Sequence, residues 1–173
     1  MTIAPIRPLY AFPVRSPSVL DPAELLPIAE GLAATATLWT DRSEPVARTW
    51  RTIAATDAFE AFVIAWPVGG SVELHDHGDS AGAVVVAAGE LVETTVAPGP
   101  DGSWAAASRP LAVGDRLAFG PGHVHDIVNR GPRPALSVHV YSPVLRAMTF
   151  FEQRAGTGPV PVRTESFHQE DGR

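Results

Sequence analysis

Apolar and polar residues follow two different periods along this chain. Between residues 21 and 36 the apolar positions recur every three or four residues, which predicts one amphipathic helix. Asp21, with Pro22 next and Glu24 three positions later, is typical of a capped helix N-terminus. From about residue 49 the apolar residues occur instead in short runs separated by glycine and proline, which predicts strands. We therefore expect a helix that packs on the outside of a β domain.

The predicted strands are short and numerous. They cover residues 59–66, 73–77, 82–88, 91–96, 116–119, 123–128, 135–141 and 148–152, with a loop at 98–103. Many short strands with glycine and proline between them favour a sandwich or a small barrel. We divide the chain into an N-terminal arm and helix (1–47), one barrel domain (48–154) and a mobile C-terminal tail (155–173).

The composition agrees with one globular domain and argues against some kinds of binding partner. The chain has 173 residues, of which 45% are hydrophobic, with 17 prolines and 15 glycines. Its net charge is −6 and it has no basic run, which argues against a nucleic-acid partner. No apolar stretch approaches the roughly 18 residues of a membrane span, and the start lacks the layout of a signal peptide. We expect a cytoplasmic monomer or small homo-oligomer with no membrane partner.

Histidine is the residue type that points to chemistry. The chain has no cysteine, so a metal ion would be held by histidine, aspartate or glutamate. Two pairs, His75 with His77 and His123 with His125, have one residue between their members. Residues two apart on a strand project from the same face, and in a barrel that face can be the interior. The two pairs therefore predict a metal centre inside the barrel.

The glycines around these histidines resemble the two cupin motifs. Residues 69–89 resemble the first motif and residues 114–129 resemble the second, which puts His125 rather than His123 at the ligand position. The first motif ordinarily has a glutamate ligand where Gly82 stands. The resemblance thus implies an all-β cupin fold, a double-stranded β-helix or jelly-roll barrel with a short N-terminal helix. It also implies a metal centre of three neutral imidazoles, those of His75, His77 and His125.

Two further segments resemble the cysteine dioxygenase family of thiol dioxygenases. They are HDHGDSAG at 75–82 and SVHVYSP at 137–143, and the resemblance covers about residues 48–152. It implies that the barrel holds Fe(II) and adds both atoms of O2 to a small thiol, with L-cysteine first among the substrates, to make a sulfinic acid. Animal members join their tyrosine to a cysteine that this chain lacks, so Tyr141 is expected to be unmodified.

Ser137, His139 and Tyr141 lie on one face of one predicted strand. Neighbours on that face are close enough for a hydrogen-bonded relay from serine to imidazole to phenol, which would orient the phenol toward the metal. The carboxylate of a substrate also needs a cation. The family places an arginine on an early strand, and Arg51 is our first choice with Arg48 as the alternative.

Two other kinds of function stay open on the sequence alone. The first is another metal-dependent cupin enzyme: a dioxygenase for mercaptopropionate or another thiol, a carbon-cleaving dioxygenase, or an isomerase. The last two ordinarily use a carboxylate ligand, which Gly82 does not offer. The second is a non-enzymatic cupin that binds a small ligand, which would have no need of the polar triad on the strand at 135–141.

Overall fold

The computed structural model describes residues 19–35, 45–154 and 157–167. Within this part of the chain there are one helix and eleven strands. The helix, α1 (Pro22–Ala33), begins with the predicted capping box. The Asp21 carboxylate accepts from the Glu24 N–H at 2.9 Å, and the Glu24 side chain accepts from the Asp21 N–H at 2.9 Å. In the described ranges no helix is long and apolar enough to cross a membrane.

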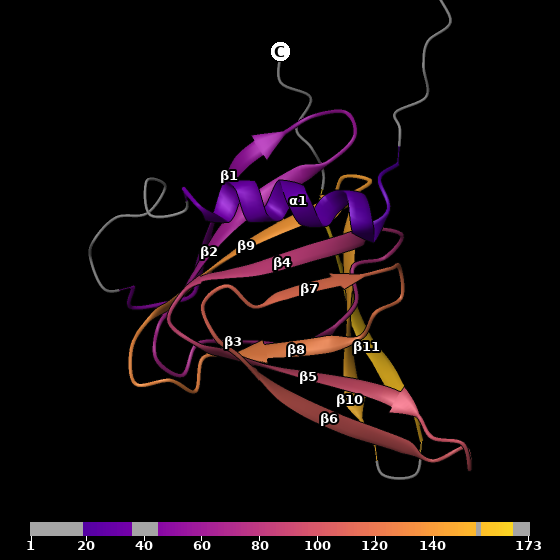
Figure 1. Cartoon of the computed structure of the whole chain (residues 1–173). Coiled ribbons are helices and arrows are strands. Elements are labelled where there is room, and N and C mark those ends of the chain that lie inside the picture. Colours follow the sequence, from indigo (N-terminus) through magenta and orange to yellow (C-terminus); the bar gives the residue numbers. More distant parts are fainter. Residues whose placement is uncertain (1–18, 36–44, 155–156, 168–173) are drawn as a thin grey trace, which may run out of the picture.

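The strands form two antiparallel sheets that face each other (Figure 1). The five-stranded sheet has the order β1 (Thr49–Ala55), β2 (Glu60–Trp66), β9 (Ala135–Ser142), β4 (Ala81–Ala88) and β7 (Arg116–Phe119). The six-stranded sheet has the order β11 (Pro159–Ser166), β10 (Ala147–Gln153), β3 (Ser71–His75), β8 (His125–Val128), β5 (Leu91–Pro98) and β6 (Trp104–Leu111). Strands that follow each other in the chain often lie in opposite sheets, so the chain winds around one shared core.

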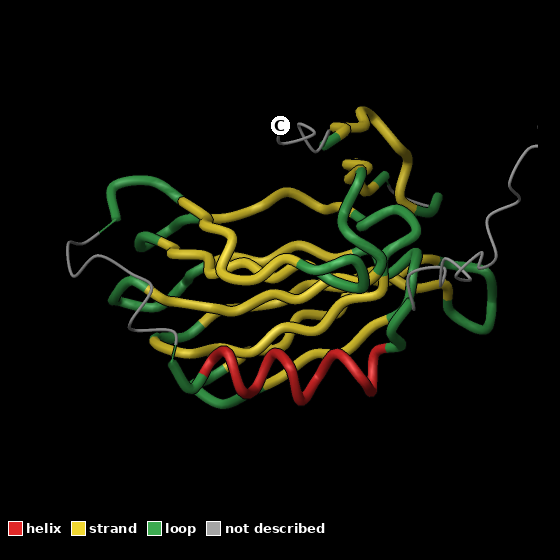
Figure 2. The backbone as a smooth tube through the Cα atoms, turned by 90° about the horizontal axis from the view of Figure 1, so that it is seen from above, coloured by secondary structure: helices red, strands yellow, loops and turns green. Residues whose placement is uncertain are grey.

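The central strand β9 is buried on both faces, and this explains where its polar residues point. Its even-numbered residues, such as Val138 and Val140, pack in one apolar cluster with Leu25 and Ala29 of α1. Figure 2 shows the helix lying along the outside of the strand layers. Side chains alternate along a strand, so the odd-numbered residues of β9 project into the barrel. An apolar strand under a helix therefore presents a polar row to the interior.

The prediction that strands begin at about residue 49 gave no limits for β1, and two further strands, β6 and β11, were not expected from the sequence. Most residues of β6 are exposed, because β6 is an edge strand paired only with β5. Its pattern therefore lacks the alternation that marks a half-buried strand. The second, β11, lies within the segment 155–173 that we predicted as a tail, and this is a correction for residues 159–166. Two prolines and mostly exposed positions hide β11 in the sequence, and its pairing with β10 is what orders it as a strand.

The limits of the histidine strands also differ from those predicted. β3 ends at His75, so His77 lies in the following loop, and β8 starts at His125, so His123 lies in the preceding loop. Part of the predicted arm (1–18) and of the predicted tail (155–156 and 168–173) lies outside the described residues.

Candidate metal centre and its cavity

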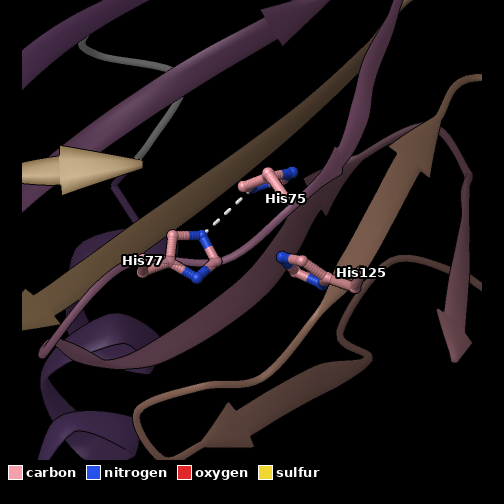
Figure 3. A group of neighbouring side chains, drawn as sticks. All are labelled: His75, His77 and His125. Carbon is pink, nitrogen blue, oxygen red and sulfur yellow. Dashed lines mark hydrogen bonds between the residues drawn. The ribbon is translucent and has the colours of Figure 1, made fainter. Parts of the chain in front are cut away.

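Three buried imidazoles meet between the sheets (Figure 3). His75 on β3 and His125 on β8 are direct cross-strand partners, which places their side chains on the same face. His77 turns back toward them from the loop after β3, and its Nε2 lies 3.2 Å from Nε2 of His75. One nitrogen from each ring lies within 4.8 Å of the others. The structure therefore brings together the three histidines predicted as metal ligands.

The loop that carries His77 is held by the carboxylate of Asp76. This carboxylate accepts from the N–H groups of Gly78 and Thr149, each at 3.1 Å. Gly78 has a φ of +58°, a left-handed conformation that glycine adopts without strain. Asp76 thus ties the loop to β10, while the residue after it points into the barrel.

Hydrogen bonds prepare two of the three rings to bind a cation. Nδ1 of His75 lies 2.7 Å from the carbonyl oxygen of Glu73, and Nδ1 of His125 lies 2.9 Å from a carboxylate oxygen of Glu93. Both partners are acceptors, so each Nδ1 carries the proton and each Nε2 presents a lone pair. Nδ1 of His77 is buried and has no hydrogen-bond partner in the described part of the chain.

Burial keeps these imidazoles uncharged. Desolvation, followed by the neighbouring His125, lowers the pKa of His75 to about 3. Desolvation and the neighbouring histidines hold the pKa of His77 well below its ordinary value, and burial lowers the pKa of His125 despite its bond to Glu93. Neutral imidazole is the form that binds a metal ion.

The arrangement fits a divalent transition-metal ion. Two imidazole nitrogens bound about 2.1 Å from one ion lie about 3.0 Å apart at a right angle and about 3.4 Å apart at a tetrahedral angle. The 3.2 Å between the Nε2 atoms of His75 and His77 falls between these values. Imidazole ligands suit iron, copper, zinc and nickel. Three ligands leave coordination positions for other molecules.

The fourth cupin ligand has no room in this barrel. A Cβ atom at Gly82 would overlap the ring of Phe119 and lie 3.1 Å from Cε1 of Tyr141. The two rings fill the space in which a glutamate side chain would begin. A glutamate at position 82 would therefore clash with these rings, and the three candidate ligands, all histidines, are electrically neutral.

Glu93 on β5 is the residue of this region that the sequence analysis missed. Its carboxylate is 1% exposed and accepts hydrogen bonds from His125, His123 and Arg109. Burial alone would raise the pKa of Glu93, but these hydrogen bonds outweigh it and hold the pKa far below its usual range. Its position in the sequence could have indicated that Glu93 is buried. Glu93 shares the inward face of its strand with Leu91, which is in the core.

Glu93, His123 and His125 form a second cluster with metal-binding groups. There, however, the two histidines direct their N–H groups at one carboxylate oxygen, and the Arg109 guanidinium contacts the other at 2.8 Å. A guanidinium already supplies the positive charge beside this carboxylate. We therefore interpret the cluster as an ion-pair network, and His75, His77 and His125 as the better candidate for a metal site. His123, in the loop before β8, bonds to Glu93 and lies outside the three-histidine group.

The polar row of β9 forms the contacts expected of a relay, and Trp66 sets its direction. The indole N–H of Trp66 donates to Ser137 Oγ at 2.8 Å, and an indole can only donate. Nε2 of His139, at 2.8 Å, is the one other partner of Ser137 Oγ in the described structure, so the buried hydroxyl proton points to it. The imidazole proton consequently sits on Nδ1, which faces Tyr141 Oη at 3.1 Å.

The last proton of this row points to the metal centre. Because Tyr141 Oη accepts from His139, its own proton is free to point elsewhere, and Nε2 of His77 lies 3.3 Å away. Burial raises the pKa of the Tyr141 phenol well above its ordinary value, so the phenol keeps its proton near neutral pH. The row therefore ends in a hydroxyl donor beside the metal ligands.

A cavity of about 280 Å3 opens over this hydroxyl. Its walls are mainly apolar and aromatic: Phe62, Ile64, Trp66, Val72, Ile127, Leu145, Met148 and Phe150. Glu165 and Phe167, which lie in the segment predicted as a tail, also line it. A cavity of this size suits a small molecule.

Arg48, the alternative to Arg51, lines the cavity. Its guanidinium carbon lies 5.6 Å from the ring centroids of both Trp50 and Trp66. Arg51 is exposed and is not among the described residues that line the cavity. It is the register partner of Val63, which belongs to the apolar cluster beneath α1, so it projects from the opposite face of the sheet.

Comparison with known proteins places the chain in a family. The family model for cysteine dioxygenase type I matches residues 17–154. The chain belongs to this cysteine dioxygenase family. The match spans α1 and every strand from β1 to β10, so it includes the three histidines and the polar row of β9.

Solved structures are similar in fold at low sequence identity. The TT1209 protein of Thermus thermophilus is 20% identical, with a TM-score of 0.51 over 62% of this chain and 94% of that one. An uncharacterized Klebsiella pneumoniae protein with a double-stranded β-helix domain is 20% identical, with a TM-score of 0.48 over 74% and 94%. A cupin superfamily protein of Desulfitobacterium hafniense is 17% identical, with a TM-score of 0.49 over 62% and 85%.

The predicted all-β cupin fold with a short helix is confirmed. Within the cysteine dioxygenase family, the buried histidine cluster of this chain supports a metal-dependent, dioxygenase-like function.

The buried histidines also make a prediction about pH. Burial lowers the pKa of His139 to about 3, as it does for His75. In the unfolded chain both titrate near 6.5, so between pH 6.5 and 3 the unfolded state binds more protons. The unfolding free energy of the metal-free protein should therefore fall on acidification by up to about 1.4 kcal/mol per pH unit for each such histidine. Urea unfolding from pH 7 to 4 measures this slope.

The matched control is His139→Gln, which removes one titrating group from the interior. Its unfolding free energy should depend less steeply on pH than that of the wild type over the same range. Equal slopes for the two proteins would show that His139 does not resist protonation in the folded state.

Proposed function

We propose that this protein is a non-haem Fe(II) thiol dioxygenase that converts a small thiol, first of all L-cysteine, into its sulfinic acid. The reaction RSH + O2 → RSO2H consumes both oxygen atoms and needs no further reductant. The observation that carries the proposal is the Tyr141 hydroxyl, which lies 3.3 Å from a predicted metal ligand at the end of a directed relay. Membership in the cysteine dioxygenase family supports the same reaction.

Ferrous iron held by the three histidines would bring thiolate and dioxygen together and donate electron density to dioxygen. Because those imidazoles are neutral, the centre keeps the full charge of the ion and favours an anionic thiolate. The apolar cavity walls exclude water from the reacting atoms, which strengthens the electrostatic interactions inside.

Two side chains would act on the substrate itself. Arg48 is partly buried at the cavity wall and offers its guanidinium to a carboxylate, with which it can form two parallel hydrogen bonds. Tyr141 keeps its proton and would donate it to the oxygen or sulfur atom that gains negative charge. His139 and Ser137 hold that phenol in place and are positioning residues.

The test is oxygen uptake by the reconstituted protein. The protein is loaded anaerobically with ferrous iron and then mixed with air-saturated buffer and L-cysteine, 3-mercaptopropionate or cysteamine. We expect one O2 consumed per sulfinate formed, with the product identified by mass spectrometry and L-cysteine the fastest substrate. An uptake rate no higher than that of His75→Ala protein mixed with the same amount of ferrous iron would refute thiol dioxygenation.

Arg48 gives a prediction about substrate selectivity. Arg48→Ala should raise KM for L-cysteine far more than for cysteamine, because cysteamine has no carboxylate for the guanidinium to hold. Loss of charge-assisted hydrogen bonds worth about 1.5–3 kcal/mol corresponds to roughly a ten- to hundredfold rise. Steady-state oxygen uptake with both thiols measures it.

The matched control is Arg51→Ala, three residues further along and on the opposite face of the sheet. It should leave the ratio of the two KM values unchanged. A selective rise in KM for L-cysteine in Arg51→Ala, without one in Arg48→Ala, would return the carboxylate site to Arg51.

A further inference from the structure

We propose that Glu93 supplies, through His125, the negative charge that the metal centre lacks among its own ligands. The role belongs to the metal centre and holds whichever substrate the enzyme takes. Glu93 does not contact the ion or the cavity in this proposal. It acts as a positioning and charge-donating residue behind one ligand.

The geometry places the carboxylate directly behind a ligand. Oε1 of Glu93 lies 2.9 Å from Nδ1 of His125, and both side chains are 1% exposed. A carboxylate that accepts the Nδ1 proton fixes the ring orientation and leaves Nε2 to bind the metal. It also makes the imidazole more basic, because the ring gains electron density as its proton is drawn toward the anion.

The ligand set of this barrel creates the need for such a charge. Position 82, where the cupin motif has its glutamate, is filled by the rings of Phe119 and Tyr141. Nδ1 of His75 donates only to a neutral carbonyl oxygen, and Nδ1 of His77 has no hydrogen-bond partner among the described residues. Of the three ligands, His125 is thus the one with an anion behind it in the described structure.

Arg109 allows the effect of the Glu93 charge on metal binding to be told apart from a purely structural role. It donates from its Nε to Oε2 of Glu93 at 2.8 Å, and its side chain is 56% exposed on edge strand β6. Its positive charge partly offsets the carboxylate. Removing Arg109 should therefore leave the carboxylate more effective, whereas a merely structural network would be weakened by the loss of either member.

The experiment measures metal affinity in three full-length proteins: wild type, Glu93→Gln and Arg109→Gln. Fe(II) and Co(II) are titrated anaerobically against a chelator of known affinity, and the Co(II) absorption bands report the ligand field. Glu93→Gln keeps the shape of the side chain and removes its charge. We expect it to bind both ions about 10- to 100-fold more weakly, the range found for lost outer-shell partners. We expect Arg109→Gln to bind as tightly as wild type or more tightly.

The Fe(III)/Fe(II) potential gives an independent reading. It should rise in Glu93→Gln, since the carboxylate stabilises the higher charge, and should stay constant or fall in Arg109→Gln. Metal affinity within twofold of wild type in Glu93→Gln would overturn the proposal. So would Arg109→Gln if it weakened binding as much as Glu93→Gln does. Should Glu93→Gln fail to fold, the Arg109→Gln affinity and potential decide alone: weaker binding or a higher potential would refute it.

Discussion

Replacing His75 or His125 by alanine is expected to abolish tight metal binding. The two residues are cross-strand partners with converging, uncharged rings, and each would provide one of the three candidate ligands. Losing one leaves two imidazoles, which cannot hold a divalent ion firmly. Loss of an outer-shell partner weakens metal binding by about 10- to 100-fold, and loss of a ligand should weaken it further. Anaerobic titration with Fe(II) and metal analysis after desalting measure the affinity and the stoichiometry, which should be about one ion per wild-type chain.

His123→Ala is the matched control. His123 lies two residues before His125 and bonds to the same carboxylate oxygen of Glu93, but its ring is outside the three-histidine group. This variant should keep the metal, because Glu93 retains its bonds to His125 and Arg109. Metal loss in His123→Ala together with retention in His125→Ala would show that His123 is the ligand and that our assignment of His125 is wrong.

Replacing Tyr141 by phenylalanine is expected to slow sulfinate formation about a hundredfold or more while iron stays bound. The ring is buried, and phenylalanine fills the same space, so folding should change little. What disappears is one hydroxyl proton held toward the metal centre by the relay from Trp66. A positioned proton donor typically contributes about 10²- to 10⁴-fold in rate.

The measurement compares dioxygen consumed with sulfinate made, at equal iron content. Wild type should give a ratio of one, and Tyr141→Phe should consume dioxygen without making an equal amount of sulfinate. His139→Gln should show a partial form of the same defect, because it disturbs the phenol only by removing the bond from Nδ1. An unchanged rate and ratio in Tyr141→Phe would reduce the polar row to a packing role.

Local sequence was enough for the features that depend on neighbours in the chain. The capping box of α1 involves residues three apart, and its two hydrogen bonds form as predicted. Ser137, His139 and Tyr141 share a face because side chains alternate along any strand, so their contacts needed only the assignment of one strand. The family follows from motifs in the chain, and the match to residues 17–154 bears it out.

Alternation along the strand separates the two candidate arginines but does not choose between them. Arg48 and Trp50 are two apart and therefore share a face, whereas Arg51 has the opposite parity. The sequence does not say which face of β1 looks inward. Pairing with β2 decides it, because Trp50 lies opposite Ile64 at the cavity and Arg51 opposite Val63 under the helix.

The sequence by itself therefore indicated the helix, most of the strands with their periodic faces, and most of the residues that carry chemistry. Only the tertiary structure decided which distant residues meet. Glu93 and His125 are 32 positions apart, and Trp66 and Ser137 are 71 apart. Strand order and register bring each pair within hydrogen-bond distance. No local pattern encodes a register between strands, because register depends on how all the strands share one core.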